Sequence, residues 1–350
     1  MASVRLVQVP AGGFRSIAVL RLSSLGDVVL SLPAVHALRA AWPGARLHFW
    51  VKEEFADVVR HDPAVDHVRV LERDARRIED VVSMGAELED CDLVVDLHGN
   101  FRTRVLTFRQ PGIVLRSPSY RVRRALWVHG RALRPSPLPH ALARYAVALA
   151  PLGLQPGGAP RLAAGAEAEA WAAAWIAKWK PSSAPVALCP GAAHPTKRWP
   201  EERWCTLADR LGAAGIPRVV IGTAADRRAL PALARGVEHD PGSRWLTEPV
   251  ARVAAALSRC PVAVTHDSGL MHVAAARGAR VVALFGSTSP VLGFAPAGEG
   301  HVVLCRNEPC QPCTLHGRAA CPRGHFRCMT ELPVDAVFDA VLSLRARVAD

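Results

Sequence analysis

Residues 17–33 have the sequence IAVLRLSSLGDVVLSLP, and this stretch decides how the rest of the chain is interpreted. Its first part, residues 17–22, is a short apolar run that predicts a buried parallel strand. Small residues follow at positions 23–26, and from Asp27 onward apolar residues recur at helical spacing. The stretch therefore predicts a strand, a tight turn and a helix, with a carboxylate at the turn.

Asp27 has two interpretations at this point. Ligands of open α/β sheets bind beyond the carboxyl ends of the strands, which is where this side chain is expected. Asp is also a preferred residue at the start of a helix, where it accepts hydrogen bonds from free N–H groups. From this stretch alone, catalysis and helix capping are equally well supported.

Strands and helices are expected to alternate along the rest of the chain. In the first half, strands are expected at residues 46–51, 65–71 and 92–97, with a helical connection at 73–84. In the second half, strands are expected at 185–189, 218–222, 262–265 and 280–286, and helices at 166–180, 201–214, 249–258 and 269–276. This alternation predicts an α/β fold with two doubly wound parallel sheets, and a ligand cleft between two domains.

The segment 155–165 is rich in Pro and Gly and is the expected domain boundary. We therefore expect one domain over residues 1–164 and a second over residues 165–350. An amphipathic helix at 333–348 ends the chain, and we expect it to pack back on the N-terminal domain.

The net charge of +12 is concentrated in one segment of the 350-residue chain. No Asp or Glu occurs between Leu97 and Ala166, whereas eleven arginines do. Arg suits the capture of phosphate and carboxylate, so the segment predicts a docking face for an anionic partner; a merely basic surface is the alternative. We expect the acceptor-binding arginines among Arg102, Arg104, Arg121, Arg123 and Arg124. No nucleic-acid-binding motif accompanies them, so no nucleic-acid partner is expected.

The sequence favours a cytoplasmic protein. Pro and Gly interrupt every apolar run before it reaches the length of a membrane span, and the N-terminus lacks the apolar core of a signal peptide. Contact with the cytoplasmic face of the inner membrane is compatible with the basic segment.

The sequence THDSG at residues 265–269 precedes a helical segment. Asp267 and Ser268 are suited to cap that helix, while its first N–H groups and its positive end suit a pyrophosphate. His272 lies near the first turn, where it either reaches the same ligand or is a packed core histidine.

A second polar turn has the sequence PGAAHPTKRWP at residues 190–200. Thr196, Lys197 and Arg198 follow a predicted strand and precede a helix, so their cations would lie at the ligand side of the sheet. The turn is not a P-loop, and solvated cations before a helix are the alternative. Together with Asp27, these turns predict the transfer of a group from a diphosphate: the carboxylate takes the proton of the attacking hydroxyl, and the cations stabilise the leaving phosphate.

These residues resemble the ADP-heptose:lipopolysaccharide heptosyltransferases of glycosyltransferase family 9, and the second enzyme of the core pathway more than the first. The matching stretches are RLSSLGDVVLSLPA, CPGA with KRWP, DSGLMHVAAA with FGSTSP, and a C-terminal CxxC…CPxGHxxC pattern. The resemblance implies a GT-B fold of two Rossmann-like domains facing across a cleft, inverting transfer, no cofactor and no catalytic metal. His194 and Pro195 occupy a variable part of the motif.

The resemblance also implies roles for individual residues and substrates. Asp27 would be the base, Lys197 would meet the donor phosphates beside Thr196 and Arg198, and the donor pocket would be formed by Asp267, Ser268, Gly269, Leu270, Met271 and His272. The implied donor is ADP-heptose and the implied acceptor an anionic lipopolysaccharide inner core. A family-9 enzyme with another donor or glycan, and a non-catalytic nucleotide-sugar or polyanion binder, are the alternatives.

Four cysteines near the C-terminus have the spacing Cys310-x2-Cys313-x7-Cys321-x6-Cys328, with His316 and His325 nearby. This set is large enough for a structural zinc site. Reduced, packed thiols are the favoured alternative, and disulfides are the third because a cytoplasmic location disfavours them.

Overall fold

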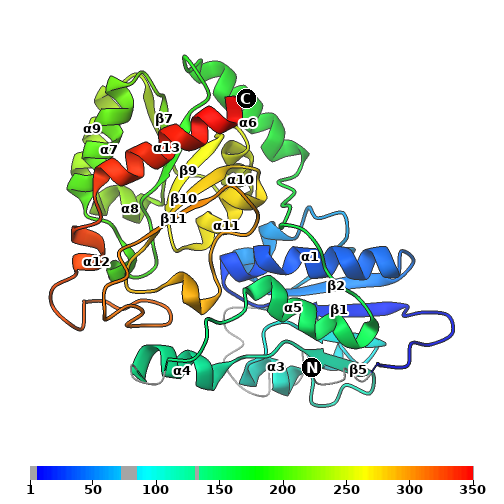
Figure 1. The fold of residues 1–350 in the computed structure, drawn as a ribbon. Coiled ribbons are helices and arrows are strands. Elements are labelled where there is room, and N and C mark those ends of the chain that lie inside the picture. The colour runs from blue at the N-terminus through cyan, green and yellow to red at the C-terminus, as the bar shows by residue number, and fades with distance from the viewer. Residues whose placement is uncertain (1–5, 72–84, 131–133, 350) are drawn as a thin grey trace. The chain divides into compact units, whose positions relative to one another are not determined.

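The computed structural model describes residues 6–71, 85–130 and 134–349 (Figure 1). The expected helical connection at 73–84 lies outside these residues. The chain divides into two compact units: unit 1 comprises Met1–Tyr120 and Pro139–Ala163, and unit 2 comprises Arg121–Leu138 and Ala164–Asp350. No helix of the described residues is both long and apolar enough to span a membrane.

Unit 1 contains a five-stranded parallel sheet with the order β3-β2-β1-β4-β5. Its strands are β1 (Ser16–Leu20), β2 (Arg46–Lys52), β3 (His67–Leu71), β4 (Leu93–Asp96) and β5 (Ile113–Arg116). Leu20, at the end of β1, is in register with Trp50 of β2 and Asp96 of β4. The chain therefore winds outward in both directions from β1 and β4, and ligands of such sheets bind at this switch point.

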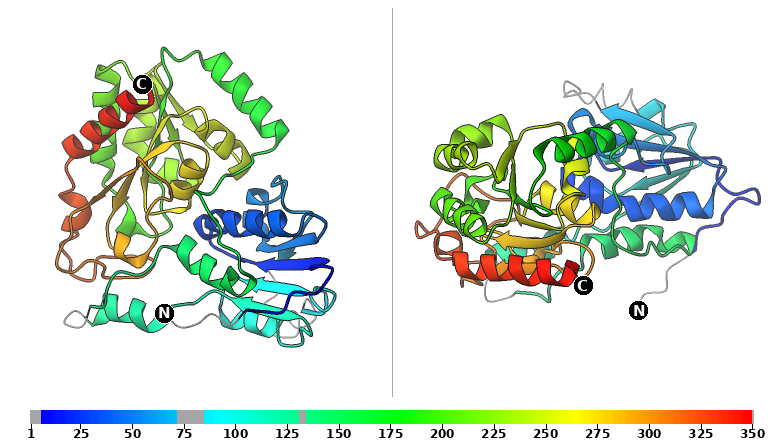
Figure 2. Two further views of the ribbon diagram at one scale, coloured as in Figure 1. Left: turned by 45° about the vertical axis from the view of Figure 1, so that its right-hand side comes forward. Right: turned by 90° about the horizontal axis from the view of Figure 1, so that it is seen from above.

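The first helix of unit 1 begins directly after the switch point. α1 (Leu25–Ala41) buries Val28, Val29, Leu32 and Val35 against the sheet, and α5 (Ala141–Leu149) lies beside it (Figures 1 and 2). The other helical elements are η1 (Glu53–Val58), α3 (Phe101–Leu106) and η3 (Ala150–Leu152). Asp27 is in α1 and Tyr145 is in α5, so the packing of these two helices places both side chains.

Unit 2 contains a six-stranded parallel sheet with the order β11-β10-β9-β6-β7-β8. Its strands are β6 (Val186–Cys189), β7 (Arg218–Ile221), β8 (Ser243–Leu246), β9 (Val262–His266), β10 (Arg280–Phe285) and β11 (Val302–Cys305). The switch point lies between β6 and β9, where Cys189 is in register with Thr265. The predicted class of two doubly wound parallel sheets is confirmed.

The helices of unit 2 place its polar turns at the carboxyl ends of β6 and β9. The turn after β6 contains η4 (Pro195–Lys197), and the turn after β9 leads into α11 (Gly269–Ala276). The others are α4 (Arg121–His129), α6 (Ala166–Trp179), α7 (Glu201–Ala213), α8 (Ala224–Ala229), α9 (Pro231–His239), α10 (Val250–Leu257), η5 (Pro290–Leu292), α12 (Arg327–Thr330) and α13 (Val334–Ala349).

The last helix, α13, packs within unit 2. Val337, Val341 and Leu344 are fully buried in the core that also contains residues of β6, β9 and β10. These apolar residues of α13 are therefore used inside unit 2, and packing of the helix on the N-terminal domain stays a prediction.

The segment Arg121–Leu138 belongs to unit 2 although it precedes the last part of unit 1 in the chain. The main-chain N–H of Leu138 donates to the Val291 carbonyl at 2.8 Å, and the Arg124 guanidinium lies 5.6 Å from the centre of the Phe294 ring. The arginine-rich stretch is consequently divided between the two units, which the sequence did not indicate.

Candidate active site

In unit 1, four hydrogen-bond donors surround the Asp27 carboxylate. Arg21 Nη2 lies 2.6 Å from Asp27 Oδ1, and the Tyr145 hydroxyl donates to the same oxygen at 3.3 Å. The Ser24 hydroxyl and the Ser24 N–H donate to Oδ2 at 2.9 and 3.4 Å. Asp27 therefore caps the helix through Oδ2 while Oδ1 faces a cation, so the two interpretations of this residue are compatible.

The Arg21–Asp27 ion pair determines the charge of the carboxylate. Burial by itself would raise the pKa of Asp27, but the Arg21 guanidinium and the bonds from Ser24 outweigh it and hold this pKa below its usual value. Arg21 is itself fixed, because its Nη1 donates to the Leu97 carbonyl at 2.6 Å. Asp27 is thus ionised at neutral pH, and 17% of its side chain remains exposed.

His98 follows β4 and lies beside this ion pair. Its main-chain N–H and that of Gly99 donate to Asp96 Oδ1, at 3.0 and 2.8 Å. Burial, and then the positive charge of Arg21, lower the pKa of His98 to about 4. The imidazole is therefore neutral at pH 7 and adds no second cation next to Asp27.

In unit 2, the structure brings together two of the predicted site residues. Lys197 Nζ lies 2.8 Å from Asp267 Oδ2, and the Thr288 hydroxyl donates to the same oxygen at 2.7 Å. The side chains of Lys197 and Asp267 are only 14% and 13% exposed. Asp267 therefore holds the Lys197 ammonium at the carboxyl end of β9.

The start of α11 retains the features of an anion site. Ser268 is the N-cap residue, yet its side chain makes no capping bond, and among the described residues its buried hydroxyl has no hydrogen-bond partner. Gly269 and Leu270 are half-buried in the first turn, whereas Met271 and His272 are buried. The first turn is thus available to a ligand, and the burial of His272 favours the core interpretation of that residue.

Thr196 and Arg198 are engaged with the protein. Thr196 is 2% exposed, and its hydroxyl accepts from the Arg318 N–H at 2.8 Å and from the Ser287 hydroxyl at 3.0 Å. Arg198 Nε donates to the Ala192 carbonyl at 2.8 Å. These contacts indicate that Thr196 stabilises the turn at residues 190–200. Lys197 is then the cation nearest to Asp267.

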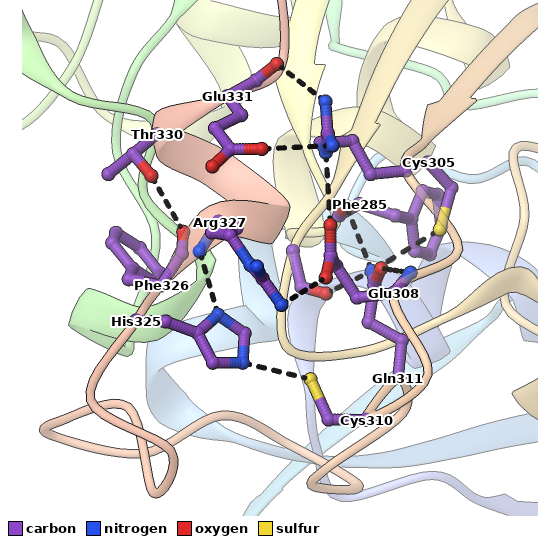
Figure 3. Close-up of polar contacts among 12 residues, drawn as sticks. Phe285, Cys305, Glu308, Cys310, Gln311, His325, Phe326, Arg327, Thr330 and Glu331 are labelled. Atoms are coloured by element: carbon purple, nitrogen blue, oxygen red, sulfur yellow. Dashed lines mark hydrogen bonds and ion pairs between the residues drawn. The ribbon is translucent and has the colours of Figure 1, made fainter.

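The C-terminal cysteine segment, residues 305–328, forms hydrogen bonds with the turn that follows β10. Figure 3 shows Gln311 of this segment beside Phe285, the last residue of β10. Gln311 Nε2 donates to the Gly286 carbonyl at 2.5 Å, and the Cys313 N–H donates to the Ser287 carbonyl at 3.0 Å. Buried Glu308 accepts from Arg306 at 3.2 Å and is paired with Arg327 at 3.5 Å. The segment therefore holds the Gly286–Ser287 turn against Thr196.

The cysteines themselves are free thiols in the described chain. Burial, and then the neighbouring thiols, raise the pKa of Cys328 to about 12, and Cys310 Sγ lies 3.7 Å from His325 Nε2 (Figure 3). Across the described ranges, no group of three or more His, Cys, Asp or Glu side chains is arranged to hold a metal ion. A metal bound by Cys310, Cys313, Cys321 and Cys328 remains an untested alternative.

The arginines expected at the acceptor side lie on two helices. Arg102 and Arg104 are on α3 of unit 1, whereas Arg121, Arg123 and Arg124 are on α4 of unit 2. Arg123 donates to the Ser136 carbonyl and hydroxyl, both at 2.9 Å.

Sequence reasoning missed two of the residues that contact Asp27, Tyr145 and Arg21. Tyr145 is 118 positions away in the chain, on α5, and no local pattern connects it with the turn. Arg21 could have been identified from the sequence, because it is a cation at the end of the apolar strand within residues 17–33.

Comparison with known proteins gives the chain its family. The model of glycosyltransferase family 9 (heptosyltransferase) matches residues 81–320. Lipopolysaccharide heptosyltransferase 1 of Pseudomonas aeruginosa is 31% identical over 331 residues, which cover 84% of each chain.

Two solved structures share the fold. Escherichia coli ADP-heptose lipopolysaccharide heptosyltransferase II is similar with a TM-score of 0.70 at 22% identity, covering 96% of this chain and 100% of that one. E. coli heptosyltransferase WaaC, solved with ADP, is similar with a TM-score of 0.67 at 20% identity, covering 94% and 99%. The GT-B fold is thereby confirmed, and the chain belongs to glycosyltransferase family 9, the heptosyltransferases.

Proposed function

We propose that this enzyme transfers heptose from ADP-heptose to the inner core of lipopolysaccharide with inversion at the anomeric carbon. Family membership supports the heptosyl transfer, and the relative solved with ADP supports an ADP-linked donor. The observation that carries the mechanism is the ionised Asp27 carboxylate, held by Arg21 beyond the end of β1.

Asp27 acts as the general base in this proposal. The bond from the Tyr145 hydroxyl, at 3.3 Å, is long for an O–H donor, so an acceptor hydroxyl can replace it at Oδ1. A carboxylate with a lowered pKa is a weak base, so it takes the proton only as the new C–O bond forms. The hydroxyl oxygen attacks the anomeric carbon, its proton passes to Asp27, and the bond to the diphosphate breaks on the opposite face.

Lys197 and the start of α11 stabilise the leaving ADP. Negative charge grows on the β-phosphate as the bond breaks, and a fixed ammonium plus oriented N–H donors stabilise such charge without reorganising. The Lys197–Asp267 pair supplies the fixed ammonium, and Ser268 with the first turn of α11 supplies donors. The transfer requires that the donor bound at unit 2 and the acceptor bound at unit 1 meet.

Arginine side chains are the proposed binding groups for the acceptor. Lipopolysaccharide inner core is anionic, and the arginines on α3 and α4 suit its phosphate and carboxylate groups. The corresponding location is the cytoplasm, at the cytoplasmic face of the inner membrane.

The direct test is product formation from defined substrates. ADP-heptose is incubated with truncated lipopolysaccharide cores, with and without a first heptose, and the products are identified by mass spectrometry. Heptosylated core with an inverted anomeric centre supports the proposal. Consumption of another nucleotide sugar would indicate a different family-9 donor, and binding without consumption would indicate a non-catalytic binder.

A further inference from the structure

Helix α3 of unit 1 and the turn after it expose two phenylalanines. Phe101 is 72% exposed and Phe108, in the turn after the helix, is 84% exposed; they are the two most exposed aromatic side chains in the described chain. Phe101 is the first residue of α3, and Phe108 lies two residues beyond its last residue, Leu106, so both rings belong to one short segment. The opposite side is packed, because Thr103 and Leu106 are buried.

Three arginines accompany these rings. Arg102, Arg104 and Arg109 are half-buried or exposed, and none of them forms an ion pair within the described residues. No carboxylate occurs between residues 98 and 165 to neutralise them. The acidic residues nearest along the chain, Asp96 and Asp92, are already engaged: Asp96 is buried and accepts from the His98 and Gly99 N–H groups, and Asp92 accepts from the Arg15 and Ser16 N–H groups.

Exposed aromatic rings flanked by unpaired cations match the chemistry of a membrane interface. Aromatic side chains gain free energy at the boundary between headgroups and acyl chains, and cations nearby are attracted to anionic lipids. An isolated phosphate ligand would engage the arginines but would give no reason to expose Phe101 and Phe108. A surface that is anionic and apolar at once explains both features together.

We propose that α3 and the turn after it, residues 101–109, are a docking face for an anionic phospholipid bilayer. α3 connects β4 to β5, the edge strand of the unit 1 sheet, so the face lies at the border of the unit (Figure 1). Docking needs neither donor nor acceptor, so it can be tested apart from the transfer reaction. Because Arg102 and Arg104 are also proposed for the acceptor, vesicles without lipopolysaccharide separate docking from acceptor binding.

The test is co-sedimentation of the full-length protein with vesicles that contain no lipopolysaccharide. We expect binding to phosphatidylethanolamine vesicles with phosphatidylglycerol, and much weaker binding to phosphatidylcholine vesicles. The double variant Phe101→Ser/Phe108→Ser should reduce the partition coefficient about tenfold or more, since it removes both apolar anchors. The matched control is Leu342→Ser on α13, a residue that is 39% exposed, and it should bind like the wild type.

The electrostatic part has its own variants. Arg104→Gln/Arg109→Gln should weaken binding at low salt by about fivefold for each arginine removed, and should flatten the dependence on salt. Arg235→Gln on α9, another exposed arginine, should have no effect. Circular dichroism and the melting temperature confirm that each variant is folded.

Three outcomes would overturn the proposal. The first is equal binding of the wild type and the phenylalanine variant. The second is sedimentation only when the vesicles contain lipopolysaccharide, which would show that this face binds the acceptor and not phospholipid. The third is binding to an oligonucleotide with none to phosphatidylglycerol vesicles, which would identify a different polyanion.

Discussion

The replacement Arg21→Gln tests how the charge of Asp27 is controlled. It removes the guanidinium that lies 2.6 Å from Asp27 Oδ1 and that lowers the pKa of Asp27. The carboxyl stays buried, and burial alone raises this pKa. An adjacent arginine commonly lowers an Asp pKa by about one to three pH units, so the Asp27 pKa should rise by about that amount in the variant. Because transfer needs ionised Asp27, the acid limb of the pH profile should move to higher pH.

The assay measures kcat/KM for ADP-heptose between pH 4 and pH 8, with saturating acceptor. Arg21→Lys keeps a cation and is the matched control, so its acid limb should stay close to that of the wild type. The ion pair also contributes to the stability of the fold. Because the pKa of Asp27 is lower in the folded protein than in the unfolded chain, this contribution is present above the unfolded pKa. It is lost as the pH falls through the folded pKa. The variant should therefore lose stability mainly at neutral pH. An acid limb that is unchanged in Arg21→Gln would refute this reasoning.

Three further predictions concern unit 2. Lys197→Ala should lower kcat by about 10²–10³ and at least as much as it raises the donor KM, because the ammonium acts mainly on charge that develops in the transition state; a pure KM effect in steady-state kinetics would contradict this. Thr196→Val should cost about 1–3 kcal/mol in urea unfolding, since the Arg318 N–H and the Ser287 hydroxyl lose their acceptor, whereas Thr196→Ser should cost little. Elemental analysis of protein purified without chelators should find less than about 0.1 zinc per chain; one zinc per chain, lost in Cys313→Ser, would establish the cysteine site instead.

Most strands and the long helices of the fold followed from the sequence, whereas three strands at sheet edges did not. Strand β2 and helices α6 and α13 have long apolar or periodic patterns, and their bounds agree with prediction within two residues. Strands β5, β8 and β11 were missed, and each lies at an edge of its sheet, whereas the equally short interior strands β4, β6 and β7 were predicted. An edge strand pairs on one side only, so its residues need not form a continuous apolar run.

The site was predicted where local sequence determines it. Asp27, Lys197 and Asp267 each follow a strand at a polar turn, and the structure places them at the carboxyl ends of β1, β6 and β9. Tyr145 was not predictable, because its contact with Asp27 depends on how α5 packs against α1. The hydrogen bonds of Thr196 could not be predicted either, because its partner Arg318 lies in a loop 122 positions away in the chain.

Asp27→Asn is the most direct test of the central claim. The variant keeps the size of the side chain and removes the proton acceptor. We predict unchanged affinity for ADP-heptose by calorimetry and a loss in kcat of about 10²–10⁴, the contribution of a positioned base. A kcat within about twofold of the wild type, with the donor bound equally well, would remove Asp27 from the reaction and contradict the account.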